Sequence, residues 1–218
     1  MVDDNTFSAR LRRAKQRARE DGFLMVLLLL LRQAMNWIGI KVNLFYWMNE
    51  RMPKDPPASM QRLADGYAFS IFGPNEIAAI IHHPERIGFK ESYVLEKYKS
   101  GDTCLGCKFN GEIAGFTWYS LTECKEWYYQ AVMEENEAYL SDIFVFKAFR
   151  GKKLSLILRY KSYEALRELG RDSYYSITDY TNKASYQFKK RLDARIVFLG
   201  LHVEFFGKWQ KRWIVKKY

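Results

Sequence analysis

One continuous stretch, residues 137–170, constrains the fold more than any other part of the sequence. Branched and aromatic residues between Tyr139 and Phe146 are typical of a buried β-strand. A short basic turn follows at residues 147–153. Apolar residues at spacings of three and four then predict a helix that begins at Leu154 and ends at Gly170. A strand, a basic turn and a helix in this order form an arrangement that can bind phosphate.

The predicted helix start is the place where an anion would bind. The first turn of a helix leaves backbone N–H groups unpaired, and the positive end of the helix dipole points outward there. Arg150, Lys152 and Lys153 add side-chain charge at this point. The alternative is an ordinary strand–helix connection whose lysines are solvated.

The residues from Val145 to Ser155, VFKAFRGKKLS, resemble the pyrophosphate-binding turn of the GNAT superfamily of acyl-CoA N-acyltransferases. The motif of that family is Arg/Gln-x-x-Gly-x-Gly/Ala, and the strand before it ends roughly as Leu-x-Val. Arg150 matches the first motif position, and Ile143 and Val145 match the strand end. Lys153 stands where the family usually has glycine, and Ser155 where it has glycine or alanine.

The resemblance covers roughly residues 65–206 and implies an α+β fold with a mixed, mostly antiparallel central sheet and flanking helices. Asn110-Gly111 predicts a two-residue type I′ turn and therefore a hairpin. The insert at residues 122–135 is either a simple loop or an acidic aromatic rim that admits an amine. The other predicted elements are strands at Tyr67–Phe72, Thr103–Phe109, Glu112–Leu121, Tyr139–Phe146, Tyr174–Thr178 and Ile196–Phe206, and helices at Glu76–His82 and Lys183–Arg191.

The resemblance also implies an activity, the transfer of an acyl group from acyl-CoA to an amine. Acetyl is the first candidate for the acyl group, acetyl-CoA or another acyl-CoA is the co-substrate, and no metal is implied. The acceptor would be a small molecule or a glycan amine. The residues implied to bind the coenzyme are Ile143, Phe144 and Val145 through their backbone, then Arg150, Gly151, Lys152, Lys153, Leu154, Ser155 and Asn182.

Two catalytic roles have candidates. In the family, a tyrosine that protonates the departing thiolate lies seven residues after the coenzyme-binding asparagine, which Asn182 resembles here. Lys189 occupies that tyrosine position in this chain, so Tyr186 is the nearest substitute. The base would lie on the strand before the turn, where alternation places Glu137 on the same face as Ile143. A bulge in this strand would shift the alternation and bring in Asp142 instead.

Residues 1–52 combine a basic arm with an apolar helix. The uncharged run Phe23–Leu31 covers about 13 Å as a helix, far less than a bilayer core of about 30 Å. Extension of the helix to Met48 reaches that length but includes Arg32 and Asn43. Three interpretations stay open: a helix on an anionic membrane surface, a buried helix or subunit contact, and a transmembrane span.

The remaining composition bounds the partners and the compartment. A proline-rich linker at residues 53–64 predicts a separate GNAT-like domain at residues 65–218. The net charge of +10 favours an acidic partner, and the absence of a recognised nucleic-acid motif argues against DNA or RNA. Cys104 and Cys107 face opposite sides of a predicted strand, which argues against a metal site.

Three cysteines and no cleavable signal pattern predict the cytoplasm, with the inner membrane face as a peripheral location. A homodimer is left open. The alternative function is a catalytically silent GNAT-like binding domain at the membrane surface.

Overall fold

The computed structural model describes residues 23–51, 65–86 and 91–218, and these form two compact units. The first unit holds residues 23–47, 178–187 and 197–218, and the second holds the other described residues. The predicted basic arm and the proline-rich linker at residues 53–64 lie outside the described residues. The division of the chain at that linker stays a prediction.

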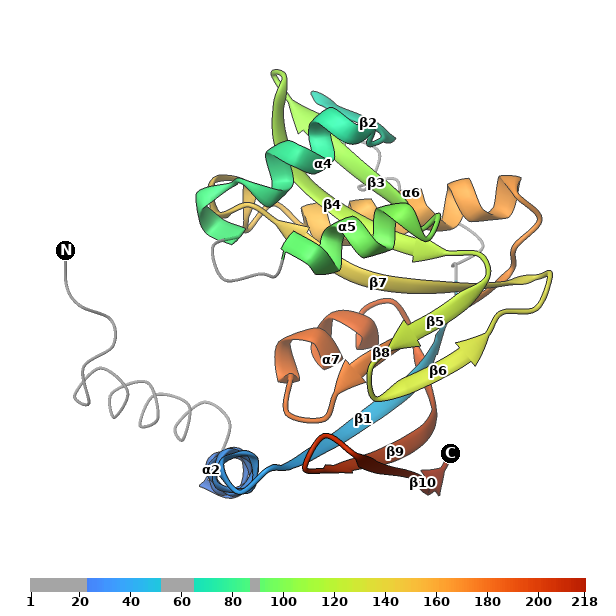
Figure 1. The fold of residues 1–218 in the computed structure, drawn as a ribbon. Coiled ribbons are helices and arrows are strands. Elements are labelled where there is room, and N and C mark those ends of the chain that lie inside the picture. The colour runs from blue at the N-terminus through green and yellow to red at the C-terminus, as the bar shows by residue number, and fades with distance from the viewer. Residues whose placement is uncertain (1–22, 52–64, 87–90) are drawn as a thin grey trace. The chain divides into compact units, whose positions relative to one another are not determined.

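The second unit is built on a mixed sheet with the strand order β8–β7–β4–β3–β2 (Figure 1). Neighbouring strands from β2 to β7 pair antiparallel, and β7 pairs parallel with β8. The predicted α+β fold with a mostly antiparallel central sheet is therefore confirmed. The elements are β2 (Tyr67–Ile71), α4 (Pro74–Ile81), α5 (Glu91–Lys99), β3 (Thr103–Phe109), β4 (Glu112–Ser120), β5 (Glu123–Glu126), β6 (Tyr129–Val132), β7 (Glu137–Val145), α6 (Leu154–Glu168) and β8 (Ser173–Asp179).

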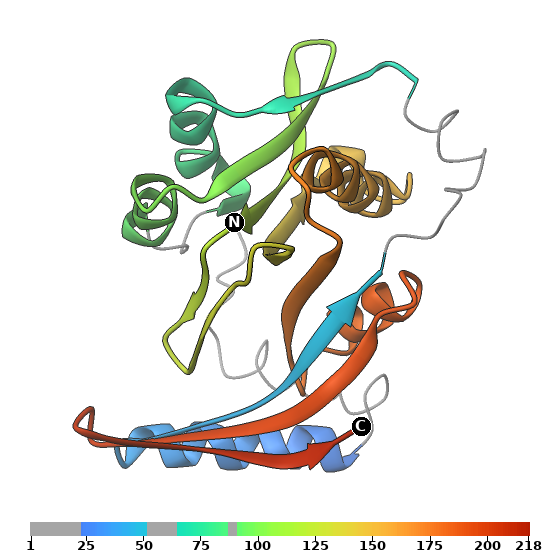
Figure 2. The same cartoon turned by 90° about the vertical axis from the view of Figure 1, so that its right-hand side faces the viewer.

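Helices cover both faces of this sheet. Helices α4 and α5 lie on one face and α6 on the other (Figure 2). Their apolar residues occur at helical spacing and are buried, as Ile77 and Ile80 of α4 and Leu154 and Leu158 of α6 show. Burial of these side chains holds the sheet between two helical layers.

The β3–β4 hairpin forms as its turn residues predict. Asn110 and Gly111 have φ angles of 50° and 84°, the left-handed conformation that a type I′ turn needs at both central residues. Phe109 pairs with Glu112 across the turn. The insert at residues 122–135 is a second small hairpin, β5–β6, and not a simple loop.

The first unit contains α2 (Phe23–Trp37) beside three strands in the order β10–β9–β1 (Figure 2). The strands are β1 (Ile40–Glu50), β9 (Arg195–Phe205) and β10 (Trp209–Lys217), and most of α7 (Lys183–Lys190) also belongs here. Among the described residues, no helix has the length and apolar character needed to cross a bilayer.

The predicted helical extension to Met48 is wrong beyond Trp37. Gly39 turns the chain with a φ of 81°, and the residues after it form β1. Asn43, Phe45 and Trp47 are buried, whereas the residues between them are half-buried, which is the two-residue period of a strand. Aromatic and branched residues favour this conformation over a helix.

Candidate active site

Strand β7 carries a bulge at Asp142. Phe116 pairs with Phe144 and Trp118 pairs with Ser141, so Asp142 and Ile143 together face Thr117. Asp142 has a φ of 39°, a left-handed conformation that Asp adopts more easily than most residues. The bulge shifts the alternation of side chains along β7. Such a shift is the condition under which Asp142, and not Glu137, is the predicted base.

Strands β7 and β8 stop pairing just before this bulge. They pair from Glu137 with Ser173 to Tyr139 with Tyr175, and among the described residues of β8 Tyr175 is the last that pairs with β7. The N–H of Phe146 donates to the carbonyl oxygen of Ala114 on β4, at 3.0 Å. Because successive N–H groups in a strand point to opposite sides, the N–H of Val145 points away from β4, toward the open edge of β7. This edge can pair with an extended ligand.

The basic turn leads directly into the start of α6, which begins at Leu154 as predicted. Gly151 and Lys153 have φ angles of 82° and 57°, so left-handed residues alternate in the turn. None of the described residues caps this helix start with a side chain, and its first turn holds no acidic residue. The N–H of Leu156 donates to the carbonyl oxygen of Lys153 at 2.9 Å, so the N–H groups of Leu154 and Ser155 are those open to an anionic ligand.

A carboxylate that the sequence analysis missed lies at this turn. Glu85 accepts hydrogen bonds from the backbone N–H of Lys147 at 2.9 and 3.0 Å, and its Oε2 lies 3.4 Å from Nη2 of Arg150. Arg150 also donates from Nε to the carbonyl oxygen of Val145, at 2.9 Å. Glu85 thus neutralises part of the positive charge that a phosphate would use.

A buried ion pair joins the bulge to the turn before α5. Nη2 of Arg86 lies 3.4 Å from Oδ2 of Asp142, and the Arg86 side chain is 1% exposed. Its guanidinium lies 5.0 Å from the ring centroid of Phe144 and 5.3 Å from that of Phe116. A buried guanidinium needs a charged partner, so Asp142 is held in place beside the bulge.

A second polar group lies one residue before the bulge. Nζ of Lys97 donates to Oγ of Ser141 at 2.8 Å and lies 3.5 Å from Oδ2 of Asp102. Burial raises the pKa of Asp102, and the positive charge of Lys97 opposes this shift. Lys97 and Asp102 border a polar cavity of about 60 Å³ between α5 and the β5–β6 hairpin, lined also by Tyr93, Glu96, Ser100, Thr122, Glu123, Lys125 and Tyr139.

Sequence reasoning missed Arg86, Lys97 and Asp102 because α5 was not predicted. Val94 and Lys97 are its buried residues, and the charged residues around them are those of an ordinary solvated segment. The one sequence signal for this cavity was the acidic and aromatic composition of the insert at residues 122–135, because Glu123 of this insert lines the cavity.

The structure does not bring the two predicted bases together. Glu137 lies five residues before Asp142, which corresponds to about 16 Å along a strand. Its Oε2 accepts a hydrogen bond from the backbone N–H of Glu134, at 3.1 Å, at the outer end of β7. Only Asp142 lies beside the bulge.

Asn182 and Tyr186 belong to the first unit. Oδ1 of Asn182 accepts a hydrogen bond from the N–H of Ser185, at 3.0 Å, so Asn182 caps the start of α7. The ring of Tyr186 lies 5.5 Å from that of Tyr46. Their predicted contacts with the coenzyme and with the leaving thiolate stay predictions.

Lys189, at the position of the family's tyrosine, is buried in the second unit. Its Nζ donates to the carbonyl oxygen of Ile177 at 2.6 Å. Burial lowers the pKa of Lys189 to about 7, although the carboxylate of Glu50 acts in the opposite direction. A lysine in this state can lose its proton near neutral pH.

In the part of the chain that the structure describes, no cluster of His, Cys, Asp and Glu could hold a metal ion. Cys104 and Cys107 are free and buried, and burial raises the pKa of both thiols, to about 12 for Cys107. A raised pKa leaves little thiolate at neutral pH, and the thiolate is the nucleophilic form of cysteine.

Several solved structures resemble this chain in fold, whereas no curated protein matches its sequence significantly. A protein from Novosphingobium aromaticivorans assigned to the GNAT acetyltransferases has 14% identity and a TM-score of 0.52, with 76% of this chain and 66% of that chain covered. A conserved protein from Staphylococcus epidermidis has 13% identity and a TM-score of 0.52, with 80% and 66% covered.

A third similar structure is that of a fungal multi-domain β-N-acetylglucosaminidase described as containing a GCN5-related glucosamine N-acetyltransferase region. It has 14% identity and a TM-score of 0.55, with 76% of this chain and 22% of that chain covered. This chain therefore spans less than two thirds of the length of each of these three proteins.

The family model of the GNAT acetyltransferases matches residues 72–193, more than half of the chain. This range includes the hairpin, the bulged strand, the basic turn and α6. The chain belongs to the GNAT family of acetyltransferases.

Proposed function

We propose that this chain transfers an acyl group, with acetyl as the first candidate, from acyl-CoA to an amine. The observation that carries the proposal is the open edge of β7, which leads through the basic turn to the uncapped start of α6. A ligand with an extended amide-containing arm and a pyrophosphate at its end matches this order of backbone donors.

The coenzyme would be held mainly by main-chain groups. The backbone of Ile143 and Val145 would pair with the pantetheine arm, and the family resemblance assigns Asn182 to the same arm. The backbone of Phe144, the third residue assigned to the arm, points instead toward Phe116 on β4. The pyrophosphate would rest on the N–H groups at the start of α6, and the groups assigned to it are Arg150, Gly151, Lys152, Lys153, Leu154 and Ser155. The left-handed φ of Lys153 supports this assignment, because it reproduces the conformation that the family's glycine adopts easily.

The reaction needs a base, an electrophilic carbonyl and a proton for the leaving group. The amine nitrogen attacks the thioester carbonyl, a C–N bond forms, and the C–S bond breaks to release the thiolate. Backbone N–H groups at the bulge would stabilise the negative charge on the carbonyl oxygen. Asp142 would accept the amine proton, directly or through water, and Tyr186 would donate a proton to the thiolate.

The acceptor would approach from α5 and the β5–β6 hairpin. Glu96, Asp102 and Glu123 line the cavity there, and a protonated amine is stabilised near carboxylates. Lys97 and Lys125 reduce this negative charge, so the cavity favours an amine that also offers hydroxyl groups. An amino sugar, free or on a glycan, has this chemistry, and one structural neighbour is described as containing a glucosamine N-acetyltransferase region.

The cytoplasm is the proposed location, because acyl-CoA is present there and the three cysteines are free thiols. The test combines calorimetric titration with acetyl-CoA and a thiol-release assay on a panel of amino sugars, polyamines and peptide amines. Saturable binding with thiol release for one acceptor class is expected. Binding without release would favour the catalytically silent alternative, and no binding at millimolar acetyl-CoA would exclude the proposed acetyl transfer.

A further inference from the structure

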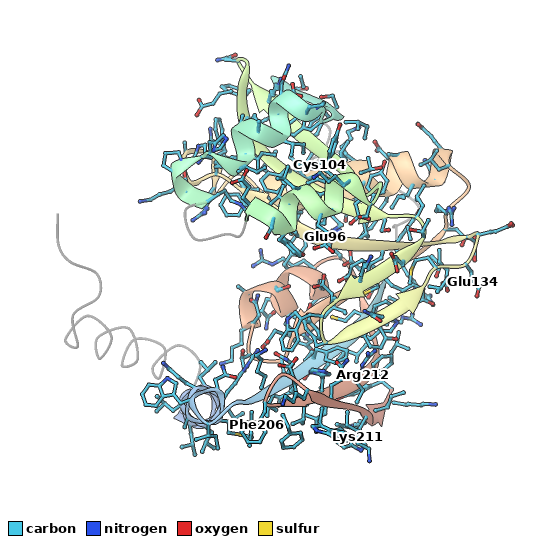
Figure 3. All side chains as sticks on the ribbon, viewed as in Figure 1. Glu96, Cys104, Glu134, Phe206, Lys211 and Arg212 are labelled. Atoms are coloured by element: carbon cyan, nitrogen blue, oxygen red, sulfur yellow. The ribbon has the colours of Figure 1, made fainter. Side chains whose placement is uncertain are left out.

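Two turns of the first unit lie next to each other, one between α2 and β1 and the other between β9 and β10. The N–H of Phe206 donates to the carbonyl oxygen of Gly39, at 2.6 Å. A Cβ atom placed on Gly39 would lie 2.7 Å from the Phe206 ring, so only glycine permits this approach. Figure 3 shows Phe206 at this end of the unit.

Four large apolar side chains around these turns are exposed. The exposed fractions are 82% for Trp37, 62% for Ile38, 69% for Phe206 and 76% for Trp209. We call these four residues the aromatic tip. Exposed apolar clusters on soluble domains mark surfaces that bind a partner, because each side chain gains free energy when it leaves water.

The apolar surface continues from the aromatic tip along α2. Four leucines of this helix, Leu27, Leu28, Leu30 and Leu31, are 41–55% exposed. An apolar groove of about 230 Å³ runs between α2 and the strands, lined mainly by Leu28, Leu31, Met35, Val42, Leu44 and Leu201. Both the exposed leucines of α2 and the groove beside this helix can therefore contact hydrocarbon.

Positive charge surrounds this apolar surface. The described residues of the first unit include eight basic and two acidic side chains, a net charge of +6. Both acidic residues are in ion pairs, Asp179 with Arg32 at 2.7 Å and Glu204 with Lys41 at 2.5 Å. The basic residues of the β9–β10 turn and of β10 are Lys208, Lys211, Arg212, Lys216 and Lys217, and all are exposed.

Aromatic and basic residues alternate on this hairpin. Lys208 precedes Trp209, and Nζ of Lys211 lies 5.4 Å from the ring centroid of Trp213. Figure 3 shows Lys211 and Arg212 on the same hairpin as Phe206. Tryptophan beside lysine and arginine is typical of protein segments at the boundary between lipid headgroups and water.

We infer that the aromatic tip and the basic residues of β10 dock on an anionic phospholipid surface. Trp37, Ile38 and Trp209 enter the headgroup layer, and the lysines bind the lipid phosphates. A second copy of the chain would bring another +6 against the same surface. The exposed leucines and Ile38 match hydrocarbon and have no counterpart on a nucleic acid. This inference does not depend on acyl transfer.

The test uses the full chain and sucrose-loaded vesicles. Sedimentation is expected with phosphatidylcholine vesicles that contain about 30% phosphatidylglycerol, and much less with pure phosphatidylcholine. The double variant Trp37→Ala, Trp209→Ala is expected to lower the partition coefficient at least about tenfold. The matched control is Trp127→Ala, because Trp127 is an exposed tryptophan of the second unit, and this variant should sediment like the parent chain.

A second pair of variants tests the charges. Replacement of Lys208 and Lys211 by Ser should lower binding to the anionic vesicles about fivefold per lysine, and added salt should reduce the difference. Lys125→Ser, on β5 of the second unit, is the control and should have no such effect. Thermal melting checks that each variant is folded.

Three results would overturn the inference. The parent chain could fail to sediment with anionic vesicles, or Trp127→Ala could lose as much binding as the tip variant. A concentration-dependent dimer that dissociates in the tip variant would show that a second copy covers the aromatic tip. Quenching of tryptophan fluorescence by brominated lipid, lost in the tip variant, would support insertion.

Discussion

Tyr163 donates a hydrogen bond of 2.6 Å to Glu50, a carboxylate that is completely buried in the second unit. Ser176 donates to the same carboxylate, and Nε of Arg159 lies 3.4 Å from Oε2 of Glu50. Burial raises the pKa of Glu50, but the charges of Arg159 and Lys189 and the two hydroxyl donors outweigh this effect, so the pKa is lowered. The cluster therefore holds one carboxylate and two potential cations away from water.

The first prediction concerns Lys189, the cation of this cluster that burial destabilises. Its pKa is about 7 in the folded chain and ordinarily 10.5. Between these values the unfolded chain binds more protons, so the free energy of unfolding should rise with pH through this window, by at most about 1.4 kcal/mol per pH unit. Lys189→Met should flatten this rise and should be more stable than the parent chain below pH 7. Urea denaturation at several pH values measures both effects.

Lys190→Met is the matched control, because Lys190 is the exposed neighbour on the same helix. It should keep the pH dependence of the parent chain. An unchanged slope in Lys189→Met would show that Lys189 keeps an ordinary pKa in the folded chain.

The second prediction concerns Glu85 at the basic turn. Glu85→Gln keeps an acceptor for the N–H of Lys147 but removes a negative charge next to Arg150. The affinity for acetyl-CoA should increase about three- to tenfold at low ionic strength and less in high salt, because the phosphates no longer face a carboxylate. Calorimetric titration measures the affinity. Glu112→Gln, at the exposed start of β4, serves as the control, and weaker binding by Glu85→Gln would count against a phosphate site at this turn.

A third prediction follows from the left-handed conformation of Lys153. Lys153→Gly removes a backbone strain of about 1–2 kcal/mol, against which the greater freedom of glycine in the unfolded chain costs up to about 1 kcal/mol. The free energy of unfolding should therefore stay equal or rise by up to about 1 kcal/mol. Lys152→Gly, the same change at a neighbour without positive φ, should lower it. Equal destabilisation by both variants would contradict the strained conformation.

The fourth prediction separates the two candidate bases. Asp142→Asn should lower the turnover number at least about a hundredfold with little change in acetyl-CoA binding, because Asn tolerates the left-handed conformation but cannot accept the amine proton. The change also removes the negative charge beside Arg86, so thermal melting first checks that the variant is folded. Glu137→Gln should retain most of the activity of the parent chain. The opposite ranking of the two variants would place the base at the outer end of β7.

Local patterns predicted the parts of the structure that local chemistry decides. The strand, turn and helix around Arg150 and the Asn110-Gly111 hairpin depend on residues within about ten positions of one another, and both form as predicted. The bulge at Asp142 was one of two alternatives, because the sequence cannot show which residues of β4 face it. The pairing of β7 with β4 decides this.

The misses have a common cause in long-range packing. Apolar residues predominate in both α2 and β1, and an apolar run by itself does not separate a helix from a strand. Strand β10, which pairs with β9, was not predicted, because its many basic residues are not typical of a strand. Arg86 and Asp142 are 56 positions apart, so only the folded chain shows that they form an ion pair.

The open edge of β7 also affects how such a chain can diverge. Past Tyr139 the surface offered to a ligand consists of peptide groups, and these are the same for every residue except proline. Mutation can therefore exchange the side chains on both faces of the strand without touching those donors. Preference for a new amine acceptor could then evolve while the backbone groups that bind acyl-CoA stay the same.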